Sequence, residues 1–419
     1  MMHSCGGMGM ANVISRYMPT AEEQLTLMRE DARYDVADER EGEHVCIPDP
    51  SLFRDISAPP PPPKVPKVFL SNNCAFNCAY CGCRCSNEQR TRYALEPAEL
   101  ARIAVAEAEK NGHGVFITSA VDKNADYTEE RIVATLRHIR ETLGYVGYVH
   151  AKVMPGTDPL LIREAGRYAD RLSVNIEVAR SEGYARIARQ KNRANILTPM
   201  RQIRDMIRDA GQYRVRGTAG RFATSQTTQL MAGSTGETDR TILTLSQALY
   251  RRYRLKRVYY TAFQYRQPAR GYDLEPVSTP LWRMRRLYQA DRLMQLYGFQ
   301  PEEITPEDQP DLQAQVDPKL AWALRNPHLF PVEVNTADYE LLLRVPGIGI
   351  VYAKKILRAR RWGTVTHEVL QKIGVSLKRS LYFIQCNGQY RGGRAFDNPA
   401  RLYALFDTDA SPVAEQLSF

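Results

Sequence analysis

Between positions 67 and 263 the chain alternates short apolar runs with longer amphipathic stretches. The short runs are rich in β-branched and aromatic residues, which is typical of strands buried in a parallel sheet. The longer stretches carry apolar residues at spacings of three and four, which predicts helices with one buried face. The expected strands are 67–71, 114–119, 145–153, 171–178, 224–233 and 257–263. The expected helices between them are 97–112, 127–144, 159–169, 200–211 and 238–255.

Six strands that alternate with helices predict an α/β fold, a partial (β/α)6 barrel rather than a closed eight-fold one. After this region the apolar spacing becomes helical throughout, which predicts an all-α domain near the C-terminus. The expected segments are 1–65, an acidic leader with a proline-rich linker; 66–275, the barrel; 276–330, a helical linker; 331–390, the all-α domain; and 391–419, a tail.

Composition narrows the class of protein. With 43% hydrophobic and 25% charged residues, the 419-residue chain can bury a large core. It has no apolar run of membrane-spanning length and no secretory leader pattern, so we expect a cytoplasmic protein without a membrane partner. The formal net charge of +10 favours an acidic partner, of which nucleic acid is the commonest.

A dense group of thiols follows the first expected strand. Cys74, Cys78 and Cys81 are spaced C-x3-C-x2-C, within a stretch that holds five of the eight cysteines of the chain. In the cytoplasm clustered cysteines more often bind metal or do redox chemistry than form disulfides. Three thiolates in one loop can hold three irons of a 4Fe-4S cubane, which leaves the fourth iron open. The loop also lies where a parallel barrel builds its active site, after the carboxyl end of a strand.

Other interpretations of the cysteines stay open. Structural zinc normally takes four ligands in two separated pairs, and only Cys386 follows Cys85, so no second pair exists downstream. Cys83 and Cys85 could assist cluster delivery, substitute as ligands, or be inert small side chains.

The spacing of Cys74, Cys78 and Cys81, with Tyr80 before the last thiol, resembles the radical SAM superfamily. The resemblance implies that S-adenosylmethionine (SAM) binds the open iron and is reductively cleaved to a 5'-deoxyadenosyl radical. Members of the superfamily carry a glycine-rich motif after the second strand, where this chain has Ser119 between a threonine and an alanine. Ser119 is therefore a candidate SAM contact.

Further candidate SAM contacts follow the fourth and fifth strands. The two-residue strand period places Ser173, Asn175 and Glu177 on one face, where they could meet the SAM ribose or carboxylate, or form an internal hydrogen-bond network. Gly233, Gly236 and Glu237 resemble the GxxGET-like element that lies beside adenine in the superfamily. They could equally begin a capped helix.

A glycine-rich turn between two expected helices is the second distinctive motif. Pro346, Gly347, Ile348 and Gly349 form a turn without bulky side chains, so its backbone N–H groups can approach a phosphate. The range 341–379 holds nine Lys or Arg and one acid, with Lys354 and Lys355 directly after the turn. The motif resembles the helix-hairpin-helix of DNA repair proteins, although an αα-hairpin can also serve packing alone. The range 343–357 aligns with 370–384 at an offset of 27 residues, which predicts a second hairpin.

With RLYQAD at 286–291 and DPKLAWALRNP at 317–327, these motifs resemble a bacterial family of radical SAM proteins assigned to DNA modification or repair. The resemblance implies an enzyme that uses a 4Fe-4S cluster and SAM, acts on DNA, and works with a one-electron reductant and a uracil-DNA-glycosylase-like protein. Two alternatives remain. One is an RNA-modifying enzyme, and the other is a non-catalytic DNA-binding iron-sulfur protein with Cys83 or Cys85 as the fourth ligand.

Overall fold

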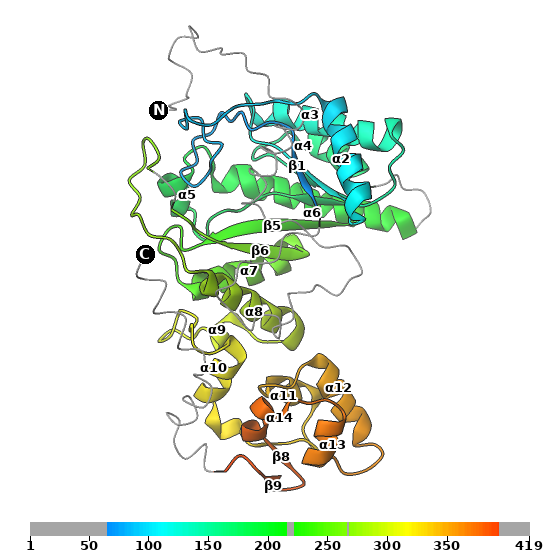
Figure 1. Cartoon of the computed structure of the whole chain (residues 1–419), viewed down its shortest axis with the longest axis vertical. Coiled ribbons are helices and arrows are strands. Elements are labelled where there is room, and N and C mark those ends of the chain that lie inside the picture. The colour runs from blue at the N-terminus through cyan, green and yellow to red at the C-terminus, as the bar shows by residue number, and fades with distance from the viewer. Residues whose placement is uncertain (1–64, 216–221, 266–267, 394–419) are drawn as a thin grey trace. The chain divides into compact units, whose positions relative to one another are not determined.

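The computed structural model describes residues 65–215, 222–265 and 268–393, and the acidic leader, the proline run and the tail lie outside these residues. The described chain forms two compact units (Figure 1). The first contains 65–237 and 248–279, and the second contains 238–247 and 280–393. Helix α7 (Asp239–Tyr253) contributes residues to both.

The first unit is built on a six-stranded, all-parallel sheet in sequential order. Its strands are β1 (Lys67–Phe69), β2 (Val115–Thr118), β3 (Val149–Lys152), β4 (Arg171–Ser173), β5 (Ser225–Ala232) and β6 (Arg257–Ala262). The first row of the sheet pairs Lys67, Phe116, His150, Arg171 and Ser225 in register. Six sequential parallel strands confirm the partial (β/α)6 barrel expected from the apolar runs.

Helices connect successive strands, as parallel pairing requires. They are α2 (Pro97–Asn111), α3 (Ala125–Arg137), the π-helix η2 (His138–Thr142), α4 (Pro159–Tyr168), α5 (Glu182–Ile187) and α6 (Arg193–Val215). As expected for crossovers of one hand, α2, α3 and α4 lie along the same face of the sheet (Figure 1). Their limits follow local signals: Asn124 caps α3 through Tyr127 N, and Gly112 ends α2 in a left-handed conformation.

The fourth strand is shorter than expected. The apolar pattern predicted a strand over 171–178, but β4 ends at Ser173. Beyond it Glu177 has a φ of +63° and pairs with Leu230 of β5 only as an isolated bridge. The regular ladder therefore stops at Ser173, and Ile176 N and Glu177 N both donate to Gln229 O where the left-handed residue redirects the backbone.

The second unit is mainly helical. It contains α8 (Leu281–Tyr297), α9 (Pro301–Ile304), α10 (Pro318–Arg325), η3 (Pro327–Leu329), α11 (Tyr339–Arg344), α12 (Ile350–Ala359), α13 (His367–Lys372), α14 (Leu377–Ser380) and η4 (Leu381–Phe383). Edge-to-face contacts link Phe299 to Trp322, Trp322 to Phe330 and Phe330 to Phe383, with ring centroids 5.3, 6.3 and 5.2 Å apart. This column of rings forms a core from segments far apart in sequence.

The C-terminal domain also has a small sheet that the apolar spacing did not indicate. Strands β7 (Val332–Glu333), β8 (Ile384–Cys386) and β9 (Gln389–Tyr390) form it, with β7 parallel to β8 and β8 antiparallel to β9. Strands of two or three residues are too short to show a two-residue alternation. The all-α expectation therefore holds for the helices and misses this sheet. In the described part of the chain, no helix has both the length and the apolar character needed to cross a membrane.

Candidate functional site

The cysteine loop lies at the carboxyl ends of the strands and is tied to them through its backbone. Ala75 N donates to Val121 O just beyond β2 at 2.7 Å, and Ala79 N donates to Ile187 O at the end of α5 at 2.8 Å. Cys85 N closes the loop on itself by donating to Phe76 O at 2.9 Å. These bonds hold the three thiols at the end of the sheet where a parallel barrel carries its chemistry.

The three thiols differ in burial and in proton affinity. Cys78 is buried, whereas Cys74 and Cys81 are partly exposed. Burial raises the pKa of Cys74 to about 11 and that of Cys78 to about 12. Hydrogen bonding from Cys83 lowers the pKa of Cys81 to about 7, against the effect of burial. One thiol is thus close to ionising at neutral pH, while the other two need a nearby positive charge to become ligands.

Lys191 supplies such a charge. Its Nζ donates to Glu177 Oε1 at 2.8 Å and to Tyr80 Oη at 3.0 Å, and the Lys191 and Glu177 side chains are only 11% and 5% exposed. Burial lowers the pKa of Lys191, but the Glu177 carboxylate together with Cys78 and Cys81 outweighs burial, so the pKa is raised and the amine stays charged. The ammonium also acts electrostatically on Cys78 and partly offsets the rise in its pKa that burial causes. A buried ion pair therefore connects the segment after β4 to the aromatic residue of the cysteine motif.

The thiols fit a cubane better than a single ion. Within the described ranges, no three His, Cys, Asp or Glu side chains converge as ligands of one metal ion. A 4Fe-4S cluster is bound differently, because each thiolate ligates a different iron. Three thiols on one loop beside a buried cation suit that arrangement, and soft thiolates suit iron-sulfur clusters.

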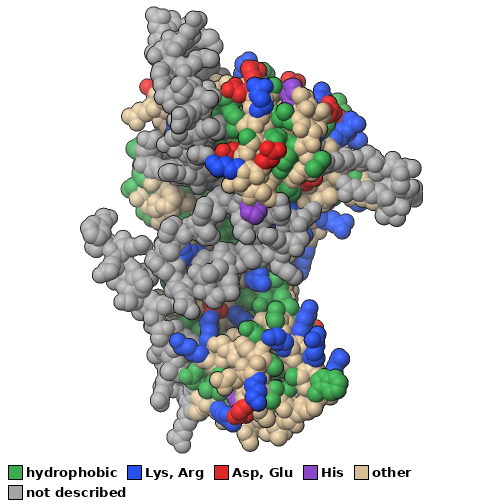
Figure 2. Space-filling model, turned by 45° about the vertical axis from the view of Figure 1, so that its right-hand side comes forward, with side chains coloured by type: hydrophobic (Ala, Val, Ile, Leu, Met, Phe, Trp, Pro, Cys, Tyr) green, Lys and Arg blue, Asp and Glu red, His purple; other side chains and the backbone are tan. Residues whose placement is uncertain are grey.

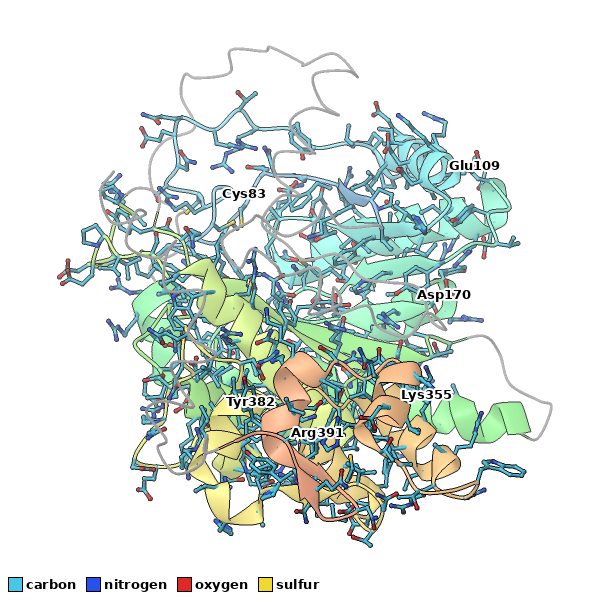
Figure 3. The ribbon with its side chains drawn as sticks, turned by 60° about the horizontal axis from the view of Figure 1, so that its bottom comes forward. Cys83, Glu109, Asp170, Lys355, Tyr382 and Arg391 are labelled. Atoms are coloured by element: carbon cyan, nitrogen blue, oxygen red, sulfur yellow. The ribbon has the colours of Figure 1, made fainter. Side chains whose placement is uncertain are left out.

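Cys83 and Cys85 differ from each other. Cys83 is buried and is not disulfide-bonded, and its N–H donates to Cys81 Sγ at 3.4 Å; it lies in the loop that follows β1 (Figure 3). Cys85 is disulfide-bonded. Of the two, Cys83 is therefore the better candidate for a substitute ligand.

Arg92 fixes the second half of the cysteine loop. Its guanidinium donates to four backbone carbonyls: those of Asn72 (2.7 Å), Cys83 (2.8 Å), Arg84 (2.7 Å) and Asn87 (3.1 Å). The rigid, forked guanidinium can bridge several acceptors in one plane, which an ammonium cannot do. Arg92 is therefore a positioning residue for the loop.

We expect Arg92→Lys to lower the free energy of unfolding by about 2–3 kcal/mol, since at least two charged hydrogen bonds to the loop are lost. The reconstituted variant should also release its iron to a chelator faster than wild type. Urea denaturation and the time course of iron release measure the two effects. Arg102→Lys on the exposed face of α2 is the control. Equal behaviour of the two variants would contradict this role.

The candidate contacts after β2 include a carboxylate that the motif comparison missed. Ser119 is buried, and its Oγ donates to Ser71 O at 3.3 Å. Three residues later Asp122, 9% exposed, accepts from Ser71 Oγ at 3.4 Å and from Asn73 Nδ2 at 3.2 Å. Asp122 therefore holds the start of the cysteine loop. It is the first acidic residue after β2, so the sequence alone could have identified it as a candidate.

The three candidates near β4 have different surroundings. Ser173 Oγ is hydrogen-bonded to His150 Nε2 at 2.9 Å, deep in the sheet. Glu177 pairs with Lys191, and Asn175 is buried without a side-chain hydrogen bond to any described residue. Two of the three thus have the internal partners that a structural network provides, and Asn175 keeps its amide for another partner.

The turn after β5 is closed by its own glutamate. Glu237 Oε1 accepts from Gly233 N at 2.5 Å, and Glu237 Oε2 accepts from Thr235 N at 3.0 Å and Thr235 Oγ1 at 2.7 Å. Gly233 and Gly236 both have positive φ, 81° and 75°, which favours glycine there. Glu237 therefore shapes the turn, whether or not the turn also faces adenine.

Two tandem helical hairpins occupy the second unit. Helices α11 and α12 form the first, and α13 and α14 form the second. Gly347 in the first turn has a φ of +86°, and Gly374 in the second has a φ of +92°. These two glycines are 27 residues apart, the offset seen in the sequence repeat. The repeat therefore has the same left-handed residue in both turns.

The first turn packs tightly and is braced from outside. A Cβ at Gly347 would lie 3.2 Å from Ser380 N of α14, and one at Gly349 would lie 3.1 Å from Tyr297 Oη. Lys319 Nζ donates to Ile348 O at 2.5 Å, and burial lowers the pKa of this amine to about 7. The DPKLAWALRNP segment thus fixes the turn that follows it, a role that its sequence did not reveal.

Polar groups of the first hairpin face outward. Pro346 and Ile348 are buried, whereas Gly347 and Gly349 are partly exposed, and their N–H groups donate to no described acceptor. Lys354 and Lys355 are exposed on α12, and Lys355 is labelled in Figure 3. Lys355 Nζ also donates to Ile373 O of the second turn at 2.8 Å. Backbone donors without an acceptor beside exposed cations are groups that can bind phosphate.

Comparison with known proteins matches both regions. Residues 68–247 match the radical SAM superfamily, and residues 330–368 match the helix-hairpin-helix motif. Proteins of this superfamily use a 4Fe-4S cluster and SAM. No curated protein matches the sequence.

Solved structures with similar folds include the FeFe-hydrogenase maturase HydG from Carboxydothermus hydrogenoformans. It is 14% identical, with a TM-score of 0.42, over 55% of this chain and 51% of that chain. Another HydG structure, also described as an FeFe-hydrogenase maturase, is 17% identical, with a TM-score of 0.39, over 55% and 49%. The chain thus spans about half the length of these structures.

Proposed function

From the radical SAM domain and the helix-hairpin-helix motif that this chain contains, we propose that it is a radical SAM enzyme that modifies or repairs a DNA base. The observation that carries the proposal is the presence, in one chain, of a three-thiol loop at the carboxyl end of a parallel sheet and of tandem hairpins, the first of which has turn amides that donate to no described acceptor. The first suits radical chemistry, and the second suits a phosphate backbone.

The residues of the first unit hold and orient the reacting groups. When bound, the 4Fe-4S cluster supplies the electron that cleaves SAM to a 5'-deoxyadenosyl radical. Cys74, Cys78 and Cys81 would hold the cluster, and Arg92 keeps their loop in place. Lys191 stays charged beside the thiols and favours their ionised form. Asn175, buried with an uncommitted amide, is the candidate near β4 best suited to hydrogen-bond SAM.

The second unit would bind the backbone of the substrate. Turn amides and lysines contact phosphates without reading bases, so they fix register and orientation. Chemistry on a base inside a duplex further requires that base to leave the stack, at a cost of a few kcal/mol. An external one-electron reductant is also needed. The uracil-DNA-glycosylase-like partner and the cytoplasmic location rest on the family resemblance and on the expected state of the thiols.

The central experiment measures 5'-deoxyadenosine formed by reconstituted, reduced protein with SAM. We expect DNA to stimulate its formation more than RNA does. Greater stimulation by RNA would favour an RNA-modifying enzyme instead. A protein with an intact cluster that forms no 5'-deoxyadenosine with either nucleic acid would favour a non-catalytic iron-sulfur protein.

The hairpin has its own test. We expect Lys354→Glu/Lys355→Glu to weaken DNA binding at least about ten-fold at low salt and to reduce the salt slope by about 2, one per phosphate contact. SAM cleavage without DNA should be unchanged. Arg102→Glu/Lys110→Glu makes the same charge change on exposed α2 positions and serves as the control. Fluorescence anisotropy of a labelled oligonucleotide measures binding, and equal affinities of the two variants would contradict the assignment.

A further inference from the structure

An exposed tryptophan lies on the surface three residues after the end of α12. Trp362 is 88% exposed, whereas Trp322 of the same unit is 6% exposed. Large aromatic side chains are mostly buried in folded proteins, so an aromatic ring in open solvent indicates a surface that binds another molecule. In the described part of the second unit, no other large hydrophobic side chain is as exposed.

The backbone on both sides of Trp362 is fixed. On one side, the guanidinium of Arg360 donates to Ala337 O at 2.6 Å. Asn335 holds the other side, since Val365 N donates to its Oδ1 at 2.8 Å and its Nδ2 donates to Val365 O at 3.0 Å. The segment between these anchors is therefore held against the first hairpin, and the ring projects from a rigid base.

The surroundings of Trp362 are cationic. Val351, Lys355 and Arg358 are exposed and lie on one side of α12, because positions four and seven apart share a helix face. Lys354 and Arg361 are also exposed, and the sequence has no acid between Glu340 and Glu368. Figure 2 shows Lys and Arg side chains beside apolar ones on the C-terminal unit, with few acids among them.

Trp362 lies beyond the C-terminal end of α12, whereas the first hairpin turn precedes the N-terminal end of the helix. The helix has ten residues, so its two ends are about 15 Å apart. A nucleic acid held at the turn by its phosphates would pass along the cationic face and reach Trp362 a few nucleotides away.

We propose that Trp362 stacks on an unpaired base of the nucleic acid that the first hairpin holds. The inference rests on the proposed function and narrows the substrate to nucleic acid with unpaired nucleotides. Every base has a flat face that an aromatic ring can cover, and arginines beside the ring bind the backbone. A protein partner would meet a patch of four exposed cations near one ring and would have to be strongly acidic, whereas nucleic acid supplies both the charge and the ring face.

The test uses the full chain with three labelled DNA probes: a single strand, the matched duplex, and that duplex with a bulge of several unpaired nucleotides. We expect Trp362→Ala to weaken binding of the single strand and the bulge roughly five-fold to a hundred-fold, with a much smaller effect on the duplex. Trp362→Phe keeps an aromatic ring and should retain most of the affinity. Val146→Ala, which removes a 91% exposed side chain of the first unit, should bind like wild type.

Fluorescence provides a direct readout of stacking. The difference between the emission of wild type and of Trp362→Phe reports on Trp362 alone, and the single strand should quench it. Single-stranded RNA is included as a further probe, because stacking does not depend on the sugar.

The outcomes separate this inference from the proposed function. If wild type binds the probes but Trp362 is not quenched and Trp362→Ala binds equally well, stacking is wrong while the proposed function stands. The stacking inference is also wrong if Trp362→Ala loses affinity equally for all three probes and Trp362→Phe does not restore it. Binding of an acidic protein at Trp362 in place of nucleic acid would likewise contradict it. If wild type binds no probe at low salt, the nucleic-acid function itself fails.

Discussion

Cys78→Ala should abolish both cluster assembly and the reductive cleavage of SAM. Cys78 is 5% exposed and lies between the two partly exposed thiols, so its loss removes the innermost of the three sulfurs. Two thiolates cannot hold three irons, because each iron corner needs its own ligand. The iron and sulfide content of reconstituted protein, its electron paramagnetic resonance spectrum when reduced, and the yield of 5'-deoxyadenosine should all fall to background.

Two other cysteine variants make the result specific. Cys386→Ala removes a buried, free thiol of the second unit and should leave iron content and SAM cleavage unchanged. Cys83→Ala should also keep the cluster, although the pKa of Cys81 should rise because the side-chain hydrogen bond from Cys83 is lost and only its backbone N–H bond remains. If the Cys78→Ala protein retained four irons and cleaved SAM, the assignment of Cys74, Cys78 and Cys81 as the cluster ligands would be wrong. Loss of the cluster in Cys83→Ala would instead identify Cys83 as a ligand and favour a structural cluster.

The second large effect concerns the ion pair beside the thiols. We expect Lys191→Met to lower the free energy of unfolding by about 3–5 kcal/mol, because it leaves the Glu177 carboxylate buried without its counter-charge. Lys191→Met/Glu177→Gln should lose less than the single variant, since the stranded charge is gone. Urea denaturation of the cluster-free protein under reducing conditions measures both.

The control for this prediction is an exposed ion pair of the same unit. Arg167 and Glu164 are 61% and 30% exposed, so Arg167→Met should leave the free energy of unfolding almost unchanged. Because Glu177, Cys78 and Cys81 together raise the pKa of Lys191 in spite of its burial, its stabilising effect is complete below the ordinary lysine pKa of 10.5 and is lost only as pH rises through the higher folded value. The difference between wild type and Lys191→Met should therefore stay constant from about pH 7 to pH 9. A difference no larger than that of Arg167→Met would show that the pair contributes little.

Short-range patterns determined much of this protein. The spacing of Cys74, Cys78 and Cys81 places three thiols on one loop without reference to the rest of the chain. The alternation of apolar runs predicted six parallel strands, and the sheet confirms them. The offset of 27 residues predicted the second hairpin, and Gly347 and Gly374 share a left-handed backbone at that offset. Such features depend on periodicity and backbone conformation within a few residues, so the sequence is enough to show them.

The tertiary structure alone decided which side chains support these motifs. Lys191 meets Tyr80 across 111 residues of chain, and no motif surrounds it. Arg92 closes the cysteine loop, and Lys319 braces the hairpin turn at Ile348. The tertiary structure also determines that Ser173 and Glu177 have internal hydrogen-bond or ion-pair partners, whereas Trp362 is exposed to solvent. Burial and partners of this kind depend on how distant segments pack. A single sequence does not contain that information, because long-range contacts leave no period along the chain.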